Sequence, residues 1–339
     1  MYCDMPFSRL HVYVNGEATL CYGQTWTSRG VGNVLTTDPM EIWRGKDAAE
    51  FRQSIVDGSF RYCTDCRCPE MIELRDPPVN FDLDSIGCLV LSYDYRCNLS
   101  CPSCRTTNQK PSPLSSTIHQ RLMESQILKH VKMISVMGSG EALFSPFFWD
   151  LIARLKTIEC HPDLCLSLTT NGTLLTSRNL DKIRASGKKI HNVEISVDAA
   201  CETTYSINRR GGDWHTLMAN IANIVACGIP LRLNFVVQSN NFREMPRFVD
   251  MCFDLGAEYV RFDALNNWGS FTREEYLERA VHFPSHPAHS ELKEVLKNPT
   301  LADKRVHMAQ LSEDFFSTLS SLRTMHTIAA GHYNKKSTT

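Results

Sequence analysis

The sequence has no run of about 18 apolar residues, so it predicts no membrane-spanning helix. Its first residues, MYCDMPFSRLHVY, lack the basic start and long apolar stretch of a secretory signal, and we expect a cytoplasmic protein. With 36 Lys and Arg against 37 Asp and Glu, the chain has no charge excess of the kind that binds nucleic acid or an anionic membrane. The 12 histidines form no HxH or HExxH pattern, so no mononuclear metal site or histidine-based nucleophile is predicted.

Cysteine, in contrast, is abundant in this sequence. The 339 residues include 14 cysteines, and nine of these lie within the first 104 residues. Without an export signal, disulfides are not expected in a reducing compartment, and clustered cysteines favour metal or redox chemistry. Hydrophobic residues at 42% and charged residues at 22% are ordinary proportions for a globular protein with a core.

The chain divides into three parts. Residues 1–78 contain five cysteines, short β-type runs and a helix-like stretch over 38–58, and a Pro-Pro pair marks their end. Residues 79–266 alternate short branched apolar runs with helix-compatible segments, which is typical of βα units with parallel strands. Residues 267–339 favour helices.

This pattern predicts an α/β fold. We expect a partial (β/α)6 TIM-like barrel, a small cysteine-rich α+β module at the N-terminus and a helical C-terminal extension; a doubly wound sheet is the alternative. The apolar runs predicted as barrel strands are 87–95, 131–139, 163–171, 191–199, 231–239 and 258–266.

Three cysteines, Cys97, Cys101 and Cys104, directly follow the first of these runs. Three thiolates on a loop leaving a parallel strand can hold three corners of a cubane iron–sulfur cluster and leave the fourth iron open. A catalytic metal needs such an open position, and barrel active sites lie at the C-terminal ends of strands. Zinc or inert buried thiols are the alternatives, but zinc prefers four ligands and a different spacing.

The CxxxCxxC pattern after the first strand resembles the signature of the radical S-adenosylmethionine (radical SAM) superfamily, and the resemblance covers the predicted barrel. It implies that the open iron binds S-adenosylmethionine, whose reductive cleavage gives a 5′-deoxyadenosyl radical that abstracts a substrate hydrogen. Many members carry an aromatic residue before the third cysteine, where this chain has Ser103. One packing contact with the adenine is therefore expected to be weaker, while all three ligands remain.

Polar residues after the later runs are predicted to contact the cofactor. They are Gly138, Ser139, Gly140, Glu141, Thr170, Asn171, Ser196, Asp198, Arg209, Asn234 and Gln238. The first four resemble the family's GGE motif, whose backbone and carboxylate meet the amino group of the cofactor, and glycine permits that close approach. Thr170 and Asn171 resemble the family's TNG turn. An ordinary turn is the alternative for both motifs.

The remaining five positions each have an alternative role. Ser196 and Asp198 stand where the family faces ribose hydroxyls or the methionyl carboxylate, although Asp198 can also be a helix N-cap. Related enzymes carry an arginine near Arg209 that pairs with the cofactor carboxylate, and an exposed basic turn is the alternative. Asn234 and Gln238 share one face of a strand, which favours cofactor or substrate contact or an internal hydrogen-bonded pair.

A second group of cysteines lies near the N-terminus. Its members are Cys3, Cys21, Cys63, Cys66 and Cys68. The first two flank a predicted Asn-Gly hairpin, and the others follow the predicted helix. Four thiolates can complete a closed site, and by chemistry alone that site would hold zinc.

The spacing of this group resembles the SPASM/twitch modules of radical SAM enzymes, which bind auxiliary iron–sulfur clusters. Because no cysteine occupies residues 69–87, the resemblance implies one auxiliary [4Fe–4S] cluster, in a twitch-like module. The usual module follows the barrel, whereas this one precedes it. One cysteine is in surplus, so the fourth ligand is either Cys66 or Cys68.

The resemblance implies a radical SAM oxidoreductase that dehydrogenates a small polar natural-product or sugar-type substrate, with the auxiliary cluster as electron acceptor. A peptide-modifying maturase that cross-links or epimerises is the alternative, and a non-catalytic iron–sulfur or zinc protein is the remote one. The expected cofactors are a [4Fe–4S] cluster with an open iron, the auxiliary cluster and S-adenosylmethionine. The expected partners are a small-molecule or peptide substrate and a reductant such as flavodoxin or ferredoxin.

Overall fold

The computed structural model describes residues 3–22, 26–27, 29–63, 82–104, 111–136 and 139–311. The chain forms two compact units: unit 1 comprises Met1–Asn98 and Gln109–Glu194, and unit 2 comprises Leu99–Asn108 and Ile195–Thr339. Three predicted site residues, Cys66, Cys68 and Gly138, lie outside the described residues. The predicted division after residues 78 and 266 stays a prediction.

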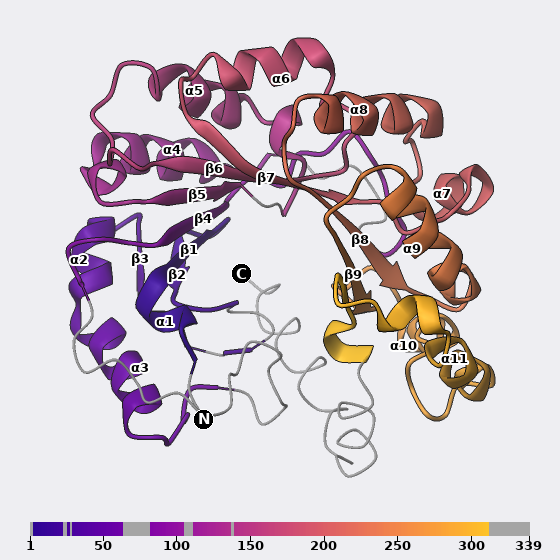
Figure 1. Cartoon of the computed structure of the whole chain (residues 1–339). Coiled ribbons are helices and arrows are strands. Elements are labelled where there is room, and N and C mark those ends of the chain that lie inside the picture. The colour runs from indigo at the N-terminus through magenta and orange to yellow at the C-terminus, as the bar shows by residue number, and fades with distance from the viewer. Residues whose placement is uncertain are drawn as a thin grey trace. The chain divides into compact units, whose positions relative to one another are not determined.

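Unit 1 is built on a mostly parallel sheet (Figure 1). Its strands are β1 (Arg9–Tyr13), β2 (Glu17–Thr19), β3 (Gly32–Asn33), β4 (Cys88–Ser92), β5 (Met133–Val136), β6 (Cys165–Thr170) and the larger part of β7 (Lys189–Ser196). They lie side by side in the order β7–β6–β5–β4–β1–β2–β3. The sequence pattern does not predict that β1 pairs in parallel with β4, which joins the cysteine module to the core strands.

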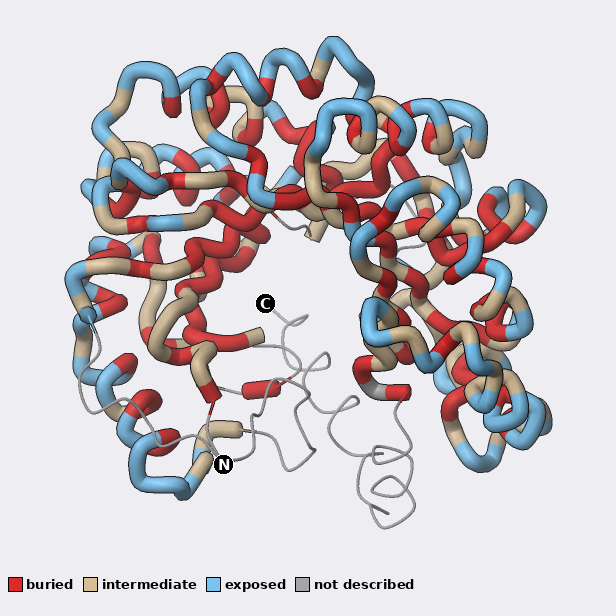
Figure 2. The backbone as a smooth tube through the Cα atoms, in the orientation of Figure 1, coloured by how far each residue is buried: buried red, intermediate tan, exposed pale blue. Residues whose placement is uncertain are grey.

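The strand register of unit 1 separates an apolar face from a polar one. Leu89, Ile134 and Leu166 lie in register and are at most 1% exposed. The neighbouring positions on the other face include Ser135 and Ser167. Figure 2 shows buried residues following the strands, while the helices alternate buried and exposed positions. The sheet face that carries the leucines therefore supplies the core of this unit.

The helices of unit 1 connect these strands. They are α1 (Met5–Ser8), α2 (Pro39–Arg44), α3 (Lys46–Val56), α4 (Ser115–Glu124), α5 (Pro146–Arg154) and α6 (Ser177–Arg184), with 3₁₀ turns η1 (Ile127–Lys129) and η2 (Ala142–Phe144). The single helix predicted over 38–58 is wrong: α2 and α3 are separate, because the chain turns at Gly45. A Cβ at Gly45 would lie 2.8 Å from the carbonyl oxygen of Glu41, so this turn requires glycine.

Unit 2 contains the parallel strands β8 (Leu231–Val237), β9 (Tyr259–Ala264) and β10 (Val306–His307). Its helices are α7 (Glu202–Asn208), α8 (Trp214–Ala226), α9 (Met245–Asp254), α10 (Arg273–Arg279) and α11 (His289–Leu296), with 3₁₀ turns η3 (Phe242–Glu244), η4 (Pro299–Ala302) and η5 (Ala309–Leu311). Phe235, Phe248 and Phe262 are fully buried between β8, β9 and α9, with ring centroids 4.8 to 5.9 Å apart. Each such ring stabilises the fold by about 1.5–3 kcal/mol.

The predicted alternation of strands and helices is confirmed. Each of β4 to β9 overlaps one of the six predicted apolar runs, with β7 beginning two residues before its run, and helices follow them along the chain. In the C-terminal part, α10 and α11 are the expected helices, whereas the short strand β10 is not predicted. No helix in the described part of the chain is both long and apolar enough to cross a membrane.

Candidate active site

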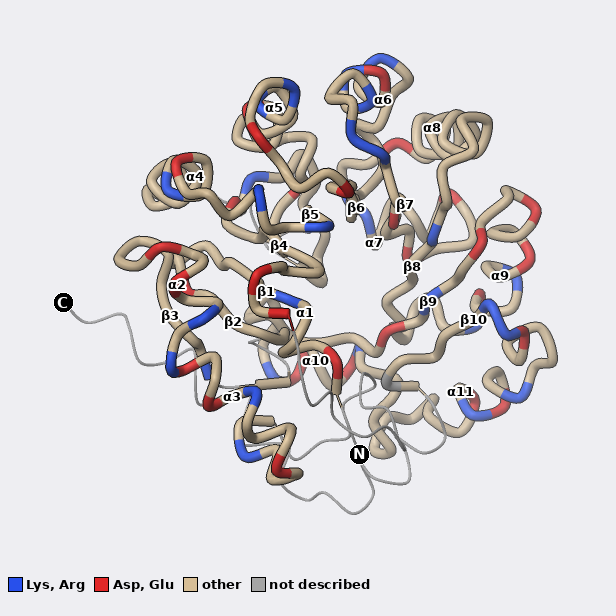
Figure 3. The backbone as a smooth tube through the Cα atoms, turned by 60° about the vertical axis from the view of Figure 1, so that its left-hand side comes forward, with Lys and Arg blue, Asp and Glu red and all other residues tan. Residues whose placement is uncertain are grey.

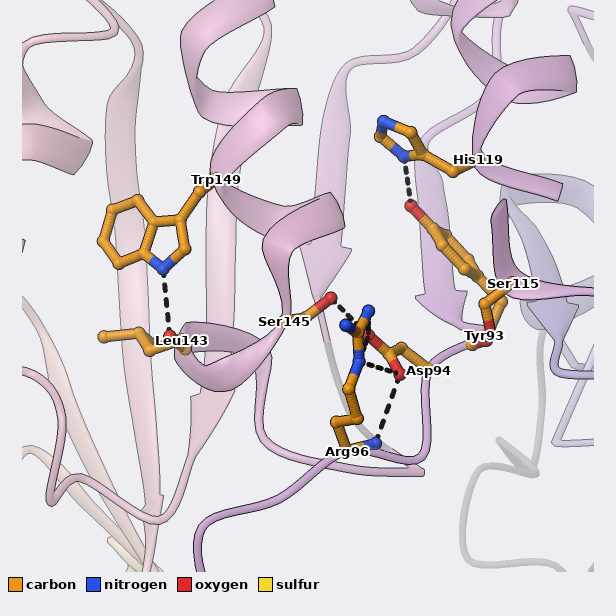
Figure 4. Close-up of polar contacts among 8 residues, drawn as sticks. All are labelled: Tyr93, Asp94, Arg96, Ser115, His119, Leu143, Ser145 and Trp149. Carbon is orange, nitrogen blue, oxygen red and sulfur yellow. Dashed lines mark hydrogen bonds and ion pairs between the residues drawn. The ribbon is translucent and has the colours of Figure 1, made fainter. Parts of the chain in front are cut away.

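The segment between β4 and the first cysteine of the CxxxCxxC loop is held by side chains from neighbouring elements (Figure 4). Ser115 at the start of α4 donates to the carbonyl oxygen of Tyr93 at 2.6 Å. Asp94 forms an ion pair of 2.6 Å with Arg96 and accepts from the hydroxyl of Ser145 at 2.5 Å. The path of the chain into the loop is therefore fixed by polar contacts from α4 and from the N-terminus of α5.

A chain of hydrogen bonds extends from the same segment and is buried at Tyr93 and His119. The hydroxyl of Tyr93 lies 2.8 Å from Nδ1 of His119, and Nε2 of His119 lies 2.7 Å from Oδ2 of Asp150. Burial raises the pKa of Tyr93, and the hydrogen bond from His119 is the main cause that lowers the pKa of Asp150. Tyr93 therefore stays neutral at physiological pH and ties the end of β4 to α4 and α5.

Gly140 permits the loop after β5 to approach this segment. A Cβ at Gly140 would lie 2.3 Å from the carbonyl oxygen of Arg96 and 2.6 Å from that of Asp94. The next amide, of Glu141, donates to the carbonyl oxygen of Arg96 at 2.7 Å. The sequence predicts that glycine in this motif admits a cofactor, and the structure shows that Gly140 also admits a neighbouring stretch of backbone. Ser139 donates to the carbonyl oxygen of Ser92 at 3.1 Å.

The carboxylate of Glu141 joins the ends of β5 and β6. It is buried at 2% exposure and accepts from Oγ1 of Thr170 at 2.6 Å and from the amide of Asn171 at 2.7 Å. The structure thus brings together three of the residues predicted to contact the cofactor. Glu141 also accepts from the amide of Leu143 at 3.1 Å, so one carboxylate holds both the loop after β5 and the turn after β6.

Asn171 reaches the start of the cysteine loop. Its Nδ2 donates to Oδ1 of Asn98 at 2.9 Å and lies 3.9 Å from Sγ of Cys97. Asn98 in turn donates to Thr173 at 2.9 Å. The TNG turn therefore holds the loop at its first cysteine and directs an N–H donor at that sulfur.

In unit 2, a buried ion pair lies beside the second cysteine. Nη2 of Arg209 lies 2.8 Å from Oδ2 of Asp198, and Nη1 lies 4.0 Å from Sγ of Cys101. Asp198 also accepts from the amide of Val236 at 2.7 Å, and its backbone is left-handed at φ +60°. Burial raises the pKa of both Asp198 and Cys101, and the Arg209 guanidinium opposes this in each case.

The N-cap alternative for Asp198 is wrong. Helix α7 begins at Glu202, its N-cap is Cys201, and the Asp198 carboxylate is engaged by Arg209 instead. Arg210, for which the sequence predicts no role, contacts the cysteine loop. Arg210 donates from Nε to the carbonyl oxygen of Ser100 at 3.1 Å and accepts from the Ser100 amide at 3.0 Å. Both arginines therefore hold the cysteine loop.

The other predicted residues of unit 2 lie around Asp198. The carbonyl oxygen of Asn234 on β8 accepts from the amide of Val197, next to Ser196 at the end of β7. Nε2 of Gln238 is buried and has no hydrogen-bond partner among the described residues, and the same holds for Nε of Arg209. Two buried donors without acceptors fit a ligand with carboxylate or hydroxyl oxygens, as S-adenosylmethionine has.

Sequence reasoning missed two residues that support this part of the site. Asn241 donates from Nδ2 to the carbonyl oxygen of Asp198 at 3.0 Å and accepts from the amide of Gln238 at 2.7 Å. Glu244 accepts from the amide of Ala200 at 2.6 Å. Both lie after β8 in segments without a motif, so only the periodic placement of strand ends at one edge could have suggested them.

Three cysteines of the N-terminal group line one pocket in unit 1. The lining residues are Cys3, Pro6, Cys21, Trp26, Phe51, Ile55 and Cys63. The predicted hairpin is confirmed: β1 and β2 pair antiparallel, with Gly16 left-handed at φ +79°. Cys63 is placed by an isolated antiparallel bridge to Thr27. Burial raises the pKa of Cys63, so an unliganded thiol there stays protonated.

Three thiols that line one mainly apolar pocket are a donor set that an iron–sulfur cluster can use. Zinc accepts the same thiolate ligands and is the alternative. The choice between Cys66 and Cys68 as fourth ligand stays a prediction.

Comparison with known proteins agrees with these features. The model of the radical SAM superfamily matches residues 92–252, and that of SPASM, an iron–sulfur cluster-binding domain, matches residues 3–68. The AdoMet-dependent heme synthase of Methanosarcina barkeri is 30% identical over 165 residues, which are 48% of this chain and 45% of that protein. The PqqA peptide cyclase of Ruegeria pomeroyi is 27% identical over 195 residues, 56% of this chain and 49% of that protein.

Among solved structures, Streptococcus suis SuiB bound to S-adenosylmethionine has a TM-score of 0.47 and 16% identity, and the match covers 67% of this chain and 50% of SuiB. The chain spans about half the length of the curated relatives that it matches.

Proposed function

We propose that this chain oxidises its substrate and passes an electron to an auxiliary cluster. The premise is that it belongs to the radical SAM superfamily and carries an N-terminal SPASM-type iron–sulfur domain. Its cofactors are a [4Fe–4S] cluster, an auxiliary cluster and S-adenosylmethionine. When bound, the first cluster and S-adenosylmethionine supply a 5′-deoxyadenosyl radical that abstracts a substrate hydrogen.

Cys97, Cys101 and Cys104 are the proposed ligands of the cluster with the open iron. Support comes from the N–H donors that approach two of the sulfur atoms: Asn171 Nδ2 lies 3.9 Å from Cys97, and Arg209 Nη1 lies 4.0 Å from Cys101. Donors to cluster sulfurs stabilise the added negative charge of the reduced state and raise its potential.

Glu141, Arg209 and Gln238 are the proposed cofactor-binding residues with the clearest structural support. Arg209 and Gln238 carry buried donors without partners among the described residues, and Glu141 is a buried carboxylate in the loop after β5. Glu141 also positions the turn at Asn171, so it serves both the cofactor and the cysteine loop.

The observation that carries the oxidation proposal is the apolar pocket around Cys3, Cys21 and Cys63. With a fourth ligand from Cys66 or Cys68, every iron of a cubane there would be held by the protein. No position is left for substrate, so the cluster's role is to accept an electron. A small polar natural-product or sugar-type molecule is the proposed substrate, with a flavodoxin or ferredoxin as reductant in the cytoplasm.

A peptide substrate is the second candidate. The Ruegeria relative is a peptide cyclase, and the matched region exceeds half of this chain. Incubation with substrate separates the two: oxidation of a small alcohol supports the first, and modification of a peptide supports the second.

Anaerobic reconstitution tests the cluster assignment. The full chain should bind about eight irons, as two cubanes require, and should release 5′-deoxyadenosine from S-adenosylmethionine on reduction. Cys97→Ala should retain about four irons and release none. Cys21→Ala should retain cleavage of S-adenosylmethionine and lose substrate oxidation.

The exposed Cys227 at the C-terminal end of α8 provides a matched control, because it belongs to neither cysteine group. Cys227→Ala should therefore keep both clusters. Unchanged 5′-deoxyadenosine release by Cys97→Ala would contradict the assignment of the first cluster. Zinc in place of iron in the N-terminal group would contradict the assignment of the auxiliary cluster.

A further inference from the structure

Arg52 on α3 is a buried cation without a carboxylate partner among the described residues. It is 2% exposed, and its guanidinium lies 4.0 Å above the ring of Trp43. Nε donates to the carbonyl oxygen of Pro6 at 2.9 Å and Nη1 donates to that of Trp43 at 2.8 Å. Nη2 is buried and has no acceptor within the described part of the chain.

Burying a charge without an opposite charge costs free energy of desolvation, so a buried arginine of this kind needs a physical explanation. The comparable buried arginine, Arg209, has the Asp198 carboxylate at 2.8 Å. Arg29, on the same module as Arg52, has two carboxylates within 2.9 Å. Burial alone lowers the pKa of Arg52 to about 10, with no acidic group acting on it, and the guanidinium is still charged at neutral pH.

The contacts of Arg52 place it directly behind the wall of the N-terminal cysteine pocket. Pro6, whose carbonyl oxygen accepts from Arg52, lines that pocket together with Cys3. Phe51 and Ile55, which flank Arg52 on α3, line it as well. Figure 3 shows that α3 carries other charges of both signs, but the exposed ones are screened by water.

A cubane held by four thiolates is anionic when oxidised and gains one further negative charge on reduction. A fixed cation nearby in a medium of low dielectric constant stabilises the reduced state more than the oxidised one. An anionic cluster in the cysteine pocket would therefore explain why the Arg52 charge is buried without a carboxylate partner among the described residues.

We propose that Arg52 is the buried counter-charge of the auxiliary cluster and raises its reduction potential, which makes it a better electron acceptor. This inference rests on the proposed assignment of that cluster to Cys3, Cys21 and Cys63. Arg52 acts through space and does not ligate iron, so it is a positioning residue. In the reaction measured below, the oxidised cluster takes up one electron from a chemical reductant.

The test is a redox titration of the auxiliary cluster, followed by electron paramagnetic resonance. A Cys97→Ala background removes the other cluster, so one signal remains. In that background we compare Arg52→Gln, Arg52→Lys and Arg29→Gln, each at about four irons per chain. Arg52→Gln should lower the midpoint potential, and Arg52→Lys should leave it near that of the parent. Arg29→Gln removes a charge that two carboxylates already balance, so it should leave the midpoint nearly unchanged.

Each outcome decides the question. An unchanged midpoint in Arg52→Gln overturns the proposal. A midpoint lowered equally in Arg52→Lys also overturns it, because the residue then acts through its hydrogen bonds and not through its charge. If Arg52→Gln fails to take up iron, Arg52→Met is titrated in its place, with a lowered midpoint expected and an unchanged midpoint overturning the proposal. Absence of any auxiliary signal in the parent would instead overturn the proposed function.

Discussion

The two groups of cysteines differ in what surrounds their sulfur atoms. The N-terminal group is lined by apolar side chains such as Trp26 and Phe51, and the buried Arg52 contacts the backbone of the lining residue Pro6. In the CxxxCxxC loop, Asn171 and Arg209 direct N–H donors at two sulfurs, and the third cysteine is exposed. Apolar enclosure suits a cluster that only exchanges electrons, whereas an open polar surrounding suits one that binds a charged ligand.

The two groups also differ in what holds them in place. Hydrophobic packing of α3 and a hairpin form the N-terminal pocket, while hydrogen bonds and ion pairs fix the loop. Polar substitutions near the loop should therefore damage one cluster and spare the other. The following predictions test that separation.

Gly140→Ala should have the largest effect. The new Cβ would lie 2.3 Å from a carbonyl oxygen of the segment that leads to Cys97, so the loop has to move. We expect iron to fall from about eight to about four per chain, with loss of 5′-deoxyadenosine release and an intact auxiliary signal.

Gly58→Ala is the matched control for this variant. Gly58 is left-handed at φ +72°, but nothing lies within 4 Å of its added Cβ. It should cost about 1 kcal/mol of stability and retain both clusters. Full iron loading of Gly140→Ala would contradict the inferred dependence of the loop on this close approach.

Arg209→Met should have the next largest effect. It leaves the Asp198 carboxylate, which is 1% exposed, without its cation. Breaking a buried ion pair from one side typically costs about 3–5 kcal/mol. Urea unfolding should show this loss, and the double variant with Asp198→Asn should recover part of it.

Arg243→Ala is the control on the surface of unit 2. The pair of Arg243 with Glu291 is exposed by about half on both sides, so its removal should cost at most about 1 kcal/mol. Equal losses in the two arginine variants would show that burial of the Asp198 pair does not matter. In both variants the auxiliary cluster should persist.

The sequence predicted the strands, and the proximity of two of its motifs, for a clear physical reason. Parallel strands end at one edge of a sheet, so the motifs ending in Glu141 and Asn171 had to lie near each other, and the structure joins them by a hydrogen bond. Apolar runs of strand length, punctuated by glycine, located β4 to β9.

The missed features depend on contacts between distant residues. The pairing of β1 with β4 joins strands about 75 residues apart, and no local pattern encodes that register. Arg52 sits in a helix with mixed charges, where an arginine normally faces solvent. The need for glycine at position 140 arises from backbone that lies more than 40 residues earlier in the chain.

The acid sensitivity of β1 gives the smallest predicted effect. His11 is buried, lies 2.8 Å from the hydroxyl of Ser92 and stacks on Tyr13. Burial, with a smaller contribution from Arg9, lowers its pKa from 6.5 to about 3. Below pH 6.5 the unfolded chain therefore binds a proton that the folded chain does not, and stability falls as the pH falls, by about 1.4 kcal/mol per unit down to pH 3.

Between pH 6.5 and pH 5 this histidine should cost about 2 kcal/mol of stability. His11→Asn should show a correspondingly shallower loss in urea unfolding at the two pH values, whatever its stability at neutral pH. His215→Asn, at a side chain 80% exposed, should keep the parent's dependence. Because β1 bears the hairpin between Cys3 and Cys21, a shallower loss in His11→Asn should also extend retention of the auxiliary cluster to lower pH. Identical pH dependence in His11→Asn and the parent would assign the acid sensitivity to other groups, of which the equally buried His282 in unit 2 is the first to examine.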